Sequence, residues 1–131
     1  MNLVKNWSIT NCHLLQKLPN DLGNLISLKL LRLSACLCLK ELPTSIGKLR
    51  KLEYLDISLC QNLKELPDEM GQLRKLQEID MRECSKIKKL PKSIGGMISL
   101  KHVICDENIG KKWIHVKHST IMDLRVDVVE A

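Results

Sequence analysis

The chain has 131 residues and a formal net charge of +6, and 44% of its residues are hydrophobic although only 2% are aromatic. Leucine fills 24 positions, and this richness in large aliphatic residues excludes a disordered chain. The length suits one domain rather than a multidomain enzyme. No apolar run approaches the roughly 18 to 20 residues of a membrane-spanning helix, and the first residues do not resemble a secretory signal peptide. We therefore expect a cytoplasmic location, in which cysteines stay reduced.

A 24-residue repeat runs through most of the chain. Three residue types recur with this spacing, at Cys12, Cys36, Cys60 and Cys84, at Pro19, Pro43, Pro67 and Pro91, and at Gly23, Gly47, Gly71 and Gly95. The large apolar residues fall into the same register, and one unit reads L-x-x-L-x-L-x-x-C-x-x-L-x-x-L-P-x-x-I-G-x-L-x-x. This pattern is that of a leucine-rich repeat.

Each unit predicts two elements in chain order. In L-x-x-L-x-L the last two leucines are two residues apart, which is the period of a strand with one buried face. After the cysteine, the proline and the I-G-x-L segment predict a helical or 3₁₀ turn on the opposite side. Stacked units form an α/β-type leucine-rich-repeat solenoid, with a short curved parallel sheet on the concave side and 3₁₀ or short helical turns on the convex side. The predicted strands fall at residues 6–11, 30–35, 54–59, 78–83 and 102–107.

The two ends of the repeat array differ from its middle. We expect the repeats to occupy residues 1–108 and a capping segment to occupy 109–131. In that segment Trp113 is expected to plug the core of the last repeat, and the alternation from Leu124 to Val128 predicts a closing strand. No amphipathic segment precedes the first unit to cover its leucines, so we expect a C-terminal piece of a longer protein or a shortened gene product.

The cysteine column has two interpretations. Neighbouring repeats bring such residues within disulfide or metal-binding reach, but leucine-rich repeats also place a small polar residue, cysteine or asparagine, at this inward position. We favour the second, because Asn108 lies one full repeat after Cys84. Cys105 falls in a core column, and Cys38 has no role that we can assign.

Catalytic, cofactor and metal sites are not indicated. The chain has no G-x-x-x-x-G-K-[ST] phosphate loop and no recognisable nucleophile motif. His115 and His118 lie three residues apart, with His102 elsewhere, and are better interpreted as solvated side chains than as metal ligands. We therefore expect a protein that is not an enzyme.

The concave strand surface is the candidate binding site. The five predicted strand windows carry a net charge of −4, which leaves +10 for the rest of the chain. A nucleic-acid-binding surface needs Lys, Arg and aromatic residues, so a basic or mixed protein partner fits better. The predicted contact residues lie in the central strands, around Tyr54 as the one exposed aromatic residue of this face. They are Leu30, Arg32, Tyr54, Asp56, Glu78, Asp80 and Arg82.

The basic excess is expected on the outer side of the solenoid. It is concentrated in residues 48–51, 74–75 and 86–92. These side chains could contact an anionic lipid surface or an acidic neighbouring domain, although simple solvation is the better interpretation.

The chain resembles a known family in its later repeats. The segments L-Q-E-I-D-M-R-E-C at 76–84 and L-K-H-V-I-C-D-E at 100–107 are similar to the C-terminal repeats of plant helper nucleotide-binding leucine-rich-repeat disease resistance receptors, the subgroup with a powdery-mildew-resistance-type coiled-coil domain. The end of the chain, with Trp113 and the segment L-R-V-D-V, is also similar. The resemblance covers nearly the whole chain.

The resemblance implies a defence-related interaction domain. In that family the repeats restrain a nucleotide-binding switch domain and contact lipase-like signalling proteins. ADP or ATP would belong to that absent switch domain, so no cofactor is expected in this chain. The alternative is a standalone intracellular leucine-rich-repeat scaffold in signalling, because repeats of small-GTPase signalling scaffolds also carry L-P-x-x-I-G.

Overall fold

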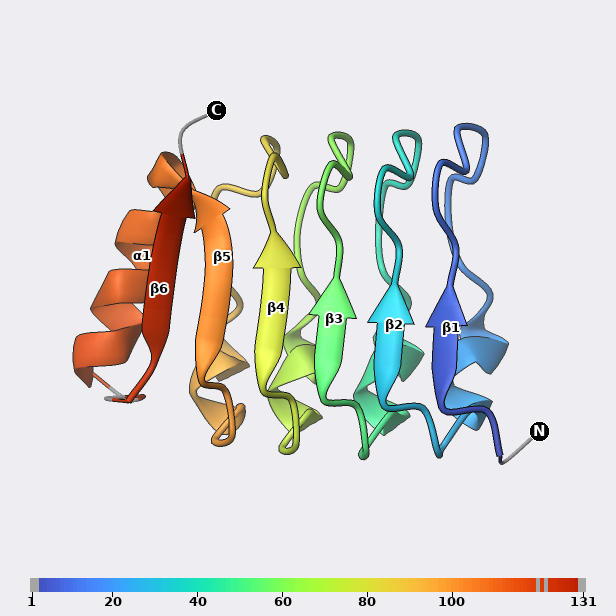
Figure 1. The fold of residues 1–131 in the computed structure, drawn as a ribbon, viewed down its shortest axis with the longest axis horizontal. Helices are drawn as coiled ribbons and strands as arrows, with labels where there is room; N and C mark the ends of the chain where they lie inside the picture. Colours follow the sequence, from blue (N-terminus) through green and yellow to red (C-terminus); the bar gives the residue numbers. More distant parts are fainter. Residues whose placement is uncertain (1–2, 120, 122, 130–131) are drawn as a thin grey trace.

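The computed structural model describes residues 3–119, 121 and 123–129, and its centre is one parallel six-stranded sheet with strands in sequence order (Figure 1). The strands are β1 (Asn6–Ser8), β2 (Leu30–Arg32), β3 (Tyr54–Asp56), β4 (Glu78–Met81), β5 (His102–Asp106) and β6 (Arg125–Val129). Four 3₁₀ segments lie behind the sheet, η1 (Asn20–Asn24), η2 (Thr44–Lys48), η3 (Asp68–Gln72) and η4 (Lys92–Gly96). One helix, α1 (Glu107–Ser119), packs beside β5 and β6. The predicted leucine-rich-repeat solenoid is confirmed.

The period of the repeat sets the register of the first five strands. Leu31 pairs with Leu55, and Leu55 in turn pairs with Ile79, so equivalent residues of successive repeats lie side by side. These inward side chains are fully buried, as are Leu33 and Ile57 two residues further along their strands. The repeat thus places equivalent apolar side chains in one continuous core, which no single unit could bury alone.

Each 3₁₀ segment begins directly after a proline of the repeat. The four prolines have φ between −64° and −70° and ψ near 150°, because the pyrrolidine ring fixes φ. Successive 3₁₀ segments pack very closely on one another. A Cβ atom placed on Gly47 of η2 would lie 2.8 Å from the Glu69 carbonyl oxygen of η3, and one on Gly71 of η3 would lie 2.6 Å from the Ser93 carbonyl oxygen of η4. The glycine column therefore permits the close stacking of successive 3₁₀ segments.

A tight turn follows each of the first four strands at a second repeated position. Asn11, Ala35, Leu59 and Glu83 all have φ between 56° and 61°, a region that side chains with a Cβ atom disfavour. In the first three turns the backbone N–H of this residue donates to a carbonyl of the next repeat, as in Leu59 to Arg82 at 2.8 Å. The inter-repeat hydrogen bonds therefore hold the turn in its disfavoured conformation.

The last repeat departs from the prediction. Helix α1, which sequence reasoning did not predict, begins at Glu107 where the other repeats form their loop. Asn108 is therefore exposed in the first helical turn, and the expectation that it takes the inward position of the cysteine column is wrong. In this described part of the chain α1 replaces a fifth loop, so the Glu83 N–H does not donate to a loop carbonyl as the equivalent residues of earlier repeats do. It donates to the two carboxylate oxygens of Asp106, at 3.1 and 3.0 Å.

The two predicted features of the closing segment are present. Trp113 is fully buried, and its indole Nε1 donates to Sδ of Met81 at 3.2 Å. Leu124 is also fully buried and leads into β6, which pairs in parallel with β5. Val128, however, is 43% exposed, so the pattern in which alternate side chains are buried does not extend to the end of this strand.

The first repeat is less well covered than the others. Trp7, Ile9, Cys12 and Leu15 are only half-buried, whereas their equivalents in the second and third repeats are fully buried. Within the part of the chain that the structure describes, nothing packs on the outer edge of β1. No described helix is long and apolar enough to span a membrane.

Candidate protein-binding surface

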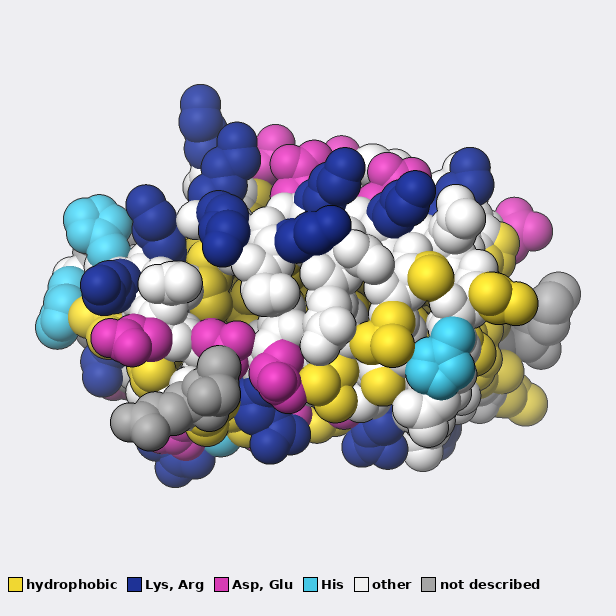
Figure 2. Space-filling model, turned by 90° about the horizontal axis from the view of Figure 1, so that it is seen from above, with side chains coloured by type: hydrophobic (Ala, Val, Ile, Leu, Met, Phe, Trp, Pro, Cys, Tyr) yellow, Lys and Arg dark blue, Asp and Glu magenta, His cyan; other side chains and the backbone are white. Residues whose placement is uncertain are grey.

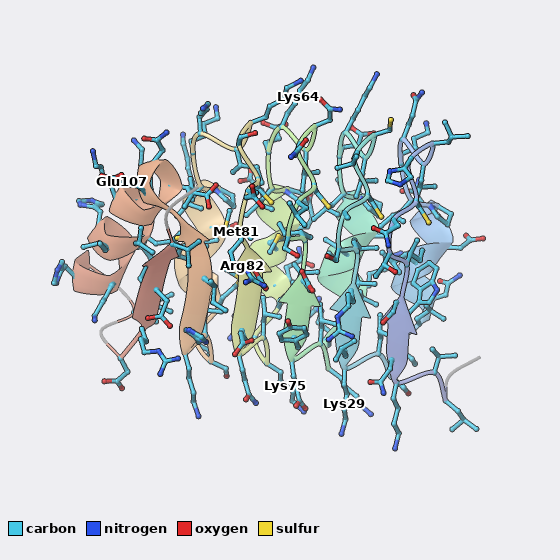
Figure 3. All side chains as sticks on the ribbon, turned by 45° about the horizontal axis from the view of Figure 1, so that its top comes forward. Lys29, Lys64, Lys75, Met81, Arg82 and Glu107 are labelled. Atoms are coloured by element: carbon cyan, nitrogen blue, oxygen red, sulfur yellow. The ribbon has the colours of Figure 1, made fainter. Side chains whose placement is uncertain are left out.

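The concave face consists of the strand side chains that point away from the core. In Figure 1 this face is turned towards the viewer, with the 3₁₀ segments behind it, and Figure 3 shows Arg82 on it at the centre of the sheet. Because the strands are in register, the side chains form rows across the sheet, one row running from Leu30 to Tyr54, Glu78 and His102. A rigid parallel sheet thus holds the surface in place.

Asp56 does not lie on the accessible surface. It is 7% exposed, and its Oδ1 atom accepts hydrogen bonds from the backbone N–H of Ser58 at 2.9 Å and from its hydroxyl at 2.7 Å. Its Oδ2 atom lies 3.4 Å from Nε of Arg32. The expectation that Asp56 is an exposed contact residue is wrong, because the turn after β3 and Arg32 occupy its carboxylate.

Asp80 is buried in the same way, at 3% exposure. Arg82 donates to it through Nε at 2.9 Å and through Nη2 at 2.7 Å, and the Arg82 backbone N–H adds a longer bond of 3.3 Å. The hydrogen bonds and negative charge of Asp80 raise the pKa of the Arg82 guanidinium. The expectation of an exposed Asp80 is therefore also wrong, whereas the Arg82 side chain is 50% exposed.

Tyr54, Leu30 and Arg32 remain accessible at the centre of the face, each half-buried. The Arg32 guanidinium carbon lies 5.8 Å from the centroid of the Tyr54 ring, a cation–π distance. Burial and the nearby Asp56 carboxylate raise the pKa of the Tyr54 hydroxyl, which keeps it protonated. The structure thus brings these three predicted residues together, and their role in binding stays a prediction.

Glu78 belongs to an ionic cluster at the C-terminal end of the face. His102 lies between two carboxylates, with Nδ1 3.0 Å from Glu78 and Nε2 2.7 Å from Asp127. Arg125 lies 3.3 Å from Asp127. The hydrogen bond with His102, together with Arg125, lowers the pKa of Asp127. Sequence reasoning missed Arg125 and Asp127, since β6 pairs with β5 at an offset one residue shorter than the repeat.

The cysteine column is structural. The thiols of Cys36, Cys60 and Cys84 donate to backbone carbonyls of the preceding repeat, at 3.5, 3.1 and 2.9 Å. Burial raises the pKa of Cys60, and that of Cys105, to about 12, so these thiols stay protonated and unreactive. Cys38 is half-buried, and nothing in the structure gives it a role. No group of three possible metal ligands occurs among the described residues.

Basic side chains lie on exposed edges of the solenoid, and exposed Lys48 and Lys92 lie on the convex 3₁₀ segments, where the sequence predicts the basic excess. Figure 2 looks onto the edge formed by the loops and shows Lys and Arg side chains gathered along it, while hydrophobic side chains gather over the N-terminal repeats. Lys40, Lys64 and Lys88 recur at the spacing of the repeat and are exposed. Lys29 and Lys75 project from the opposite edge of the sheet (Figure 3).

The leucine-rich repeat region family matches residues 7–125, and the chain belongs to this family. No curated protein matches the chain in sequence. Its structure is similar to the leucine-rich repeat domain of the type III effector XopL, with a TM-score of 0.66 and 30% identity, over 72% of this chain and 31% of that one. A leucine-rich-repeat protein of Leptospira interrogans has a TM-score of 0.57 and 27% identity, over 86% of this chain and 34% of its own.

A third similar structure is the plant peptide hormone receptor RGFR1 in complex with RGF2. It has a TM-score of 0.53 and 22% identity, over 88% of this chain and 22% of the receptor, and it supports the fold alone. The chain thus spans about a third or less of each of these three proteins. Domains of this family are in general protein-interaction modules rather than enzymes.

Proposed function

We propose that this chain is a protein-interaction domain that binds its partner through the concave face. The observation that carries the proposal is Tyr54, a half-buried aromatic side chain at the centre of a rigid sheet, flanked by Leu30 and Arg32. Binding energy concentrates at such central aromatic and arginine residues, because they combine a large contact area with hydrogen-bond donors.

We further propose that the domain is the leucine-rich-repeat region of a cytoplasmic plant disease resistance receptor of the helper class. The support is the similarity of residues 76–84 and 100–107 to the repeats of those receptors. Its partners would be the nucleotide-binding domain of the receptor, which it would restrain, and lipase-like immune signalling proteins. ADP or ATP would bind to that other domain and not to this chain.

The test is a pull-down of the full chain with the isolated nucleotide-binding domain of a helper receptor and with a lipase-like signalling protein. We expect Tyr54→Ala to weaken binding at least about 10-fold, since truncation of a central interface residue costs more than about 1.4 kcal/mol. Lys92→Ala, an exposed change on the convex side, is the matched control. Binding that Tyr54→Ala leaves unchanged would exclude the concave face.

The choice of partner separates the two functional classes. Binding to either receptor component supports the immune role. Failure to bind both, together with binding to a small GTPase, would instead identify a standalone signalling scaffold, while the dependence on Tyr54 would still support the proposed surface.

A further inference from the structure

The centre of the concave face offers hydrogen-bond donors and few acceptors. All four carboxylate oxygens of Asp56 and Asp80 are engaged: Ser58 and Arg32 occupy those of Asp56, and Arg82 occupies those of Asp80. Both residues are also buried, at 7% and 3% exposure. Burial therefore leaves these carboxylates little access to hydrogen-bond donors of a partner, and they no longer support the expectation of a basic partner.

The two arginines have unused donors. Each guanidinium carries five N–H groups in a fixed plane. Arg32 contacts Asp56 through Nε and makes no other ion pair among the described residues, and Arg82 uses Nε and Nη2 on Asp80. Their side chains are 41% and 50% exposed. Asp80 holds one edge of the Arg82 guanidinium, and Asp56 and the Tyr54 ring contact that of Arg32. The remaining N–H groups are therefore oriented before a partner arrives, which reduces the entropic cost of binding.

The spacing of the arginines suits an extended chain. Arg32 reaches from β2 to Asp56 on β3, and Arg82, which follows β4, reaches back to Asp80 on β4. Asp56 and Asp80 are paired, so the two guanidinium groups are held at neighbouring strands, which are about 4.8 Å apart. An extended peptide rises about 3.3 Å per residue and its alternate side chains share one face, so side chains two residues apart lie roughly 6.6 Å apart and can face both groups. Tyr54 on β3 and its paired neighbour Leu30, on the same strand as Arg32, supply an apolar contact.

We propose that the arginine patch, defined by Leu30, Arg32, Tyr54 and Arg82, binds an extended acidic segment of a partner protein. Two carboxylates two residues apart contact the two guanidinium groups, and a further apolar side chain on the same face of the segment packs on Tyr54. Guanidinium groups bind carboxylates through paired, charge-assisted hydrogen bonds. Glu78, an accessible carboxylate that pairs with Tyr54 across the strands, is held by His102 at 3.0 Å. This inference rests on the proposed function, of which it names the partner chemistry.

The test uses the full chain and a displayed library of random 12-residue peptides. We expect the selected peptides to be enriched in pairs of Asp or Glu two residues apart. Replacement of both acids by Gln in one selected peptide should weaken binding, measured by fluorescence anisotropy, at least about 10-fold. Arg32→Gln should weaken the binding of the acidic peptide by a similar factor. Lys75→Gln, at the far edge of the sheet (Figure 3), should change binding less than about twofold.

Arg82 needs a paired variant, because its loss alone leaves the buried Asp80 without its cation. Asp80→Asn with Arg82→Gln keeps a hydrogen-bonding pair and buries no charge, and it should bind the acidic peptide as weakly as Arg32→Gln does. Thermal melting by circular dichroism checks that each variant folds.

The outcomes separate this inference from the proposed function. Selected peptides that depend on Tyr54 but carry no acidic residues would overturn the acidic partner and leave the concave interface intact. Peptides whose binding changes with neither Tyr54→Ala nor the arginine variants would overturn both. A selection in which no peptide is enriched over a protein-free control also overturns the acidic partner.

Discussion

Replacement of Trp113 by alanine should destabilise the C-terminal end of the solenoid more than any exposed change in α1. The Trp113 side chain is fully buried, and its indole N–H donates to Sδ of Met81, a residue that is itself fully buried. An indole buries about 200 Å², which corresponds to about 5 kcal/mol at about 25 cal/mol per Å². Measured losses for such truncations are about 3–5 kcal/mol, since the surrounding side chains relax into part of the cavity.

This loss converts into a measurable change in melting temperature. The unfolding entropy of a domain is about 2.1 cal/mol/K per residue, or roughly 0.28 kcal/mol/K for 131 residues. A loss of about 4 kcal/mol therefore lowers the melting temperature by about 15 °C if the chain unfolds as one unit. Thermal melting followed by circular dichroism measures this shift. Ile114→Ala, a neighbouring change at a side chain that is 41% exposed, is the control and should lower it by less than about 4 °C.

Hydrogen exchange locates the damage. In a solenoid each repeat contacts only its neighbours, so α1, β5 and β6 should lose protection before β2 and β3. If Trp113→Ala melts within a few degrees of Ile114→Ala, the indole does not close the core and the reasoning is refuted.

Three further predictions concern the repeats, the ionic cluster and the thiols. Gly47→Ala should destabilise the fold by about 1–3 kcal/mol in denaturant unfolding, because the new Cβ atom would lie 2.8 Å from the Glu69 carbonyl oxygen; an unchanged midpoint would contradict close stacking of the 3₁₀ segments. The lowered pKa of Asp127 means that its contribution to stability is present above about pH 3.8 and disappears as pH falls through the folded-state value. Melting of Asp127→Asn should therefore differ from the parent at pH 7 and converge with it near pH 2, and a constant difference would argue against the His102 contact. Cys60, with a pKa of about 12, should resist iodoacetamide at pH 8 in the folded protein, whereas the half-buried Cys38 reacts first; equal labelling rates would show that the column is open to solvent.

The repeat made the sheet predictable down to its register. Equivalent residues such as Leu31, Leu55 and Ile79 pair across the strands, because only this register buries every inward side chain at once. The cysteine column was predictable for the same reason, since three of its thiols meet the same kind of carbonyl in successive repeats.

The cap was less predictable, because it occurs once and has no column to support it. Ile109, Trp113 and Val116 follow a helical spacing of four and three residues and face the core, so a signal for α1 was present. The repeat predicts a loop at the same place, and the two patterns conflict over residues 107–110. The shortened offset between β5 and β6 has no sequence signal of its own and depends on the length of the helix and its connection.

The accessible chemistry of the concave face was the least predictable feature. Strand alternation predicts which face a side chain points to. It does not predict whether the residue two positions further along will form hydrogen bonds with that side chain. Asp56 is followed two residues later by Ser58, and Asp80 by Arg82, so each carboxylate finds hydrogen-bond donors within its own repeat. Arg32 of the preceding repeat adds an ion pair to Asp56. Aspartate commonly bonds the backbone two residues on, and these local contacts take the carboxylates of Asp56 and Asp80 out of the accessible surface.

The same contacts link the proposed binding surface to the stability of the fold. Arg82 is held by Asp80 on β4, whose neighbour β5 packs against α1, whereas Arg32 is held by Asp56 on β3, further from that end. Since repeats communicate only through their neighbours, loosening the cap should displace Arg82 while leaving Arg32 in place. The two guanidinium groups would then lose their fixed separation, and a partner that needs both would bind a weakened cap less well even though every contact residue is unchanged. We therefore expect the cap to act on the proposed binding surface by holding the spacing of the two arginines.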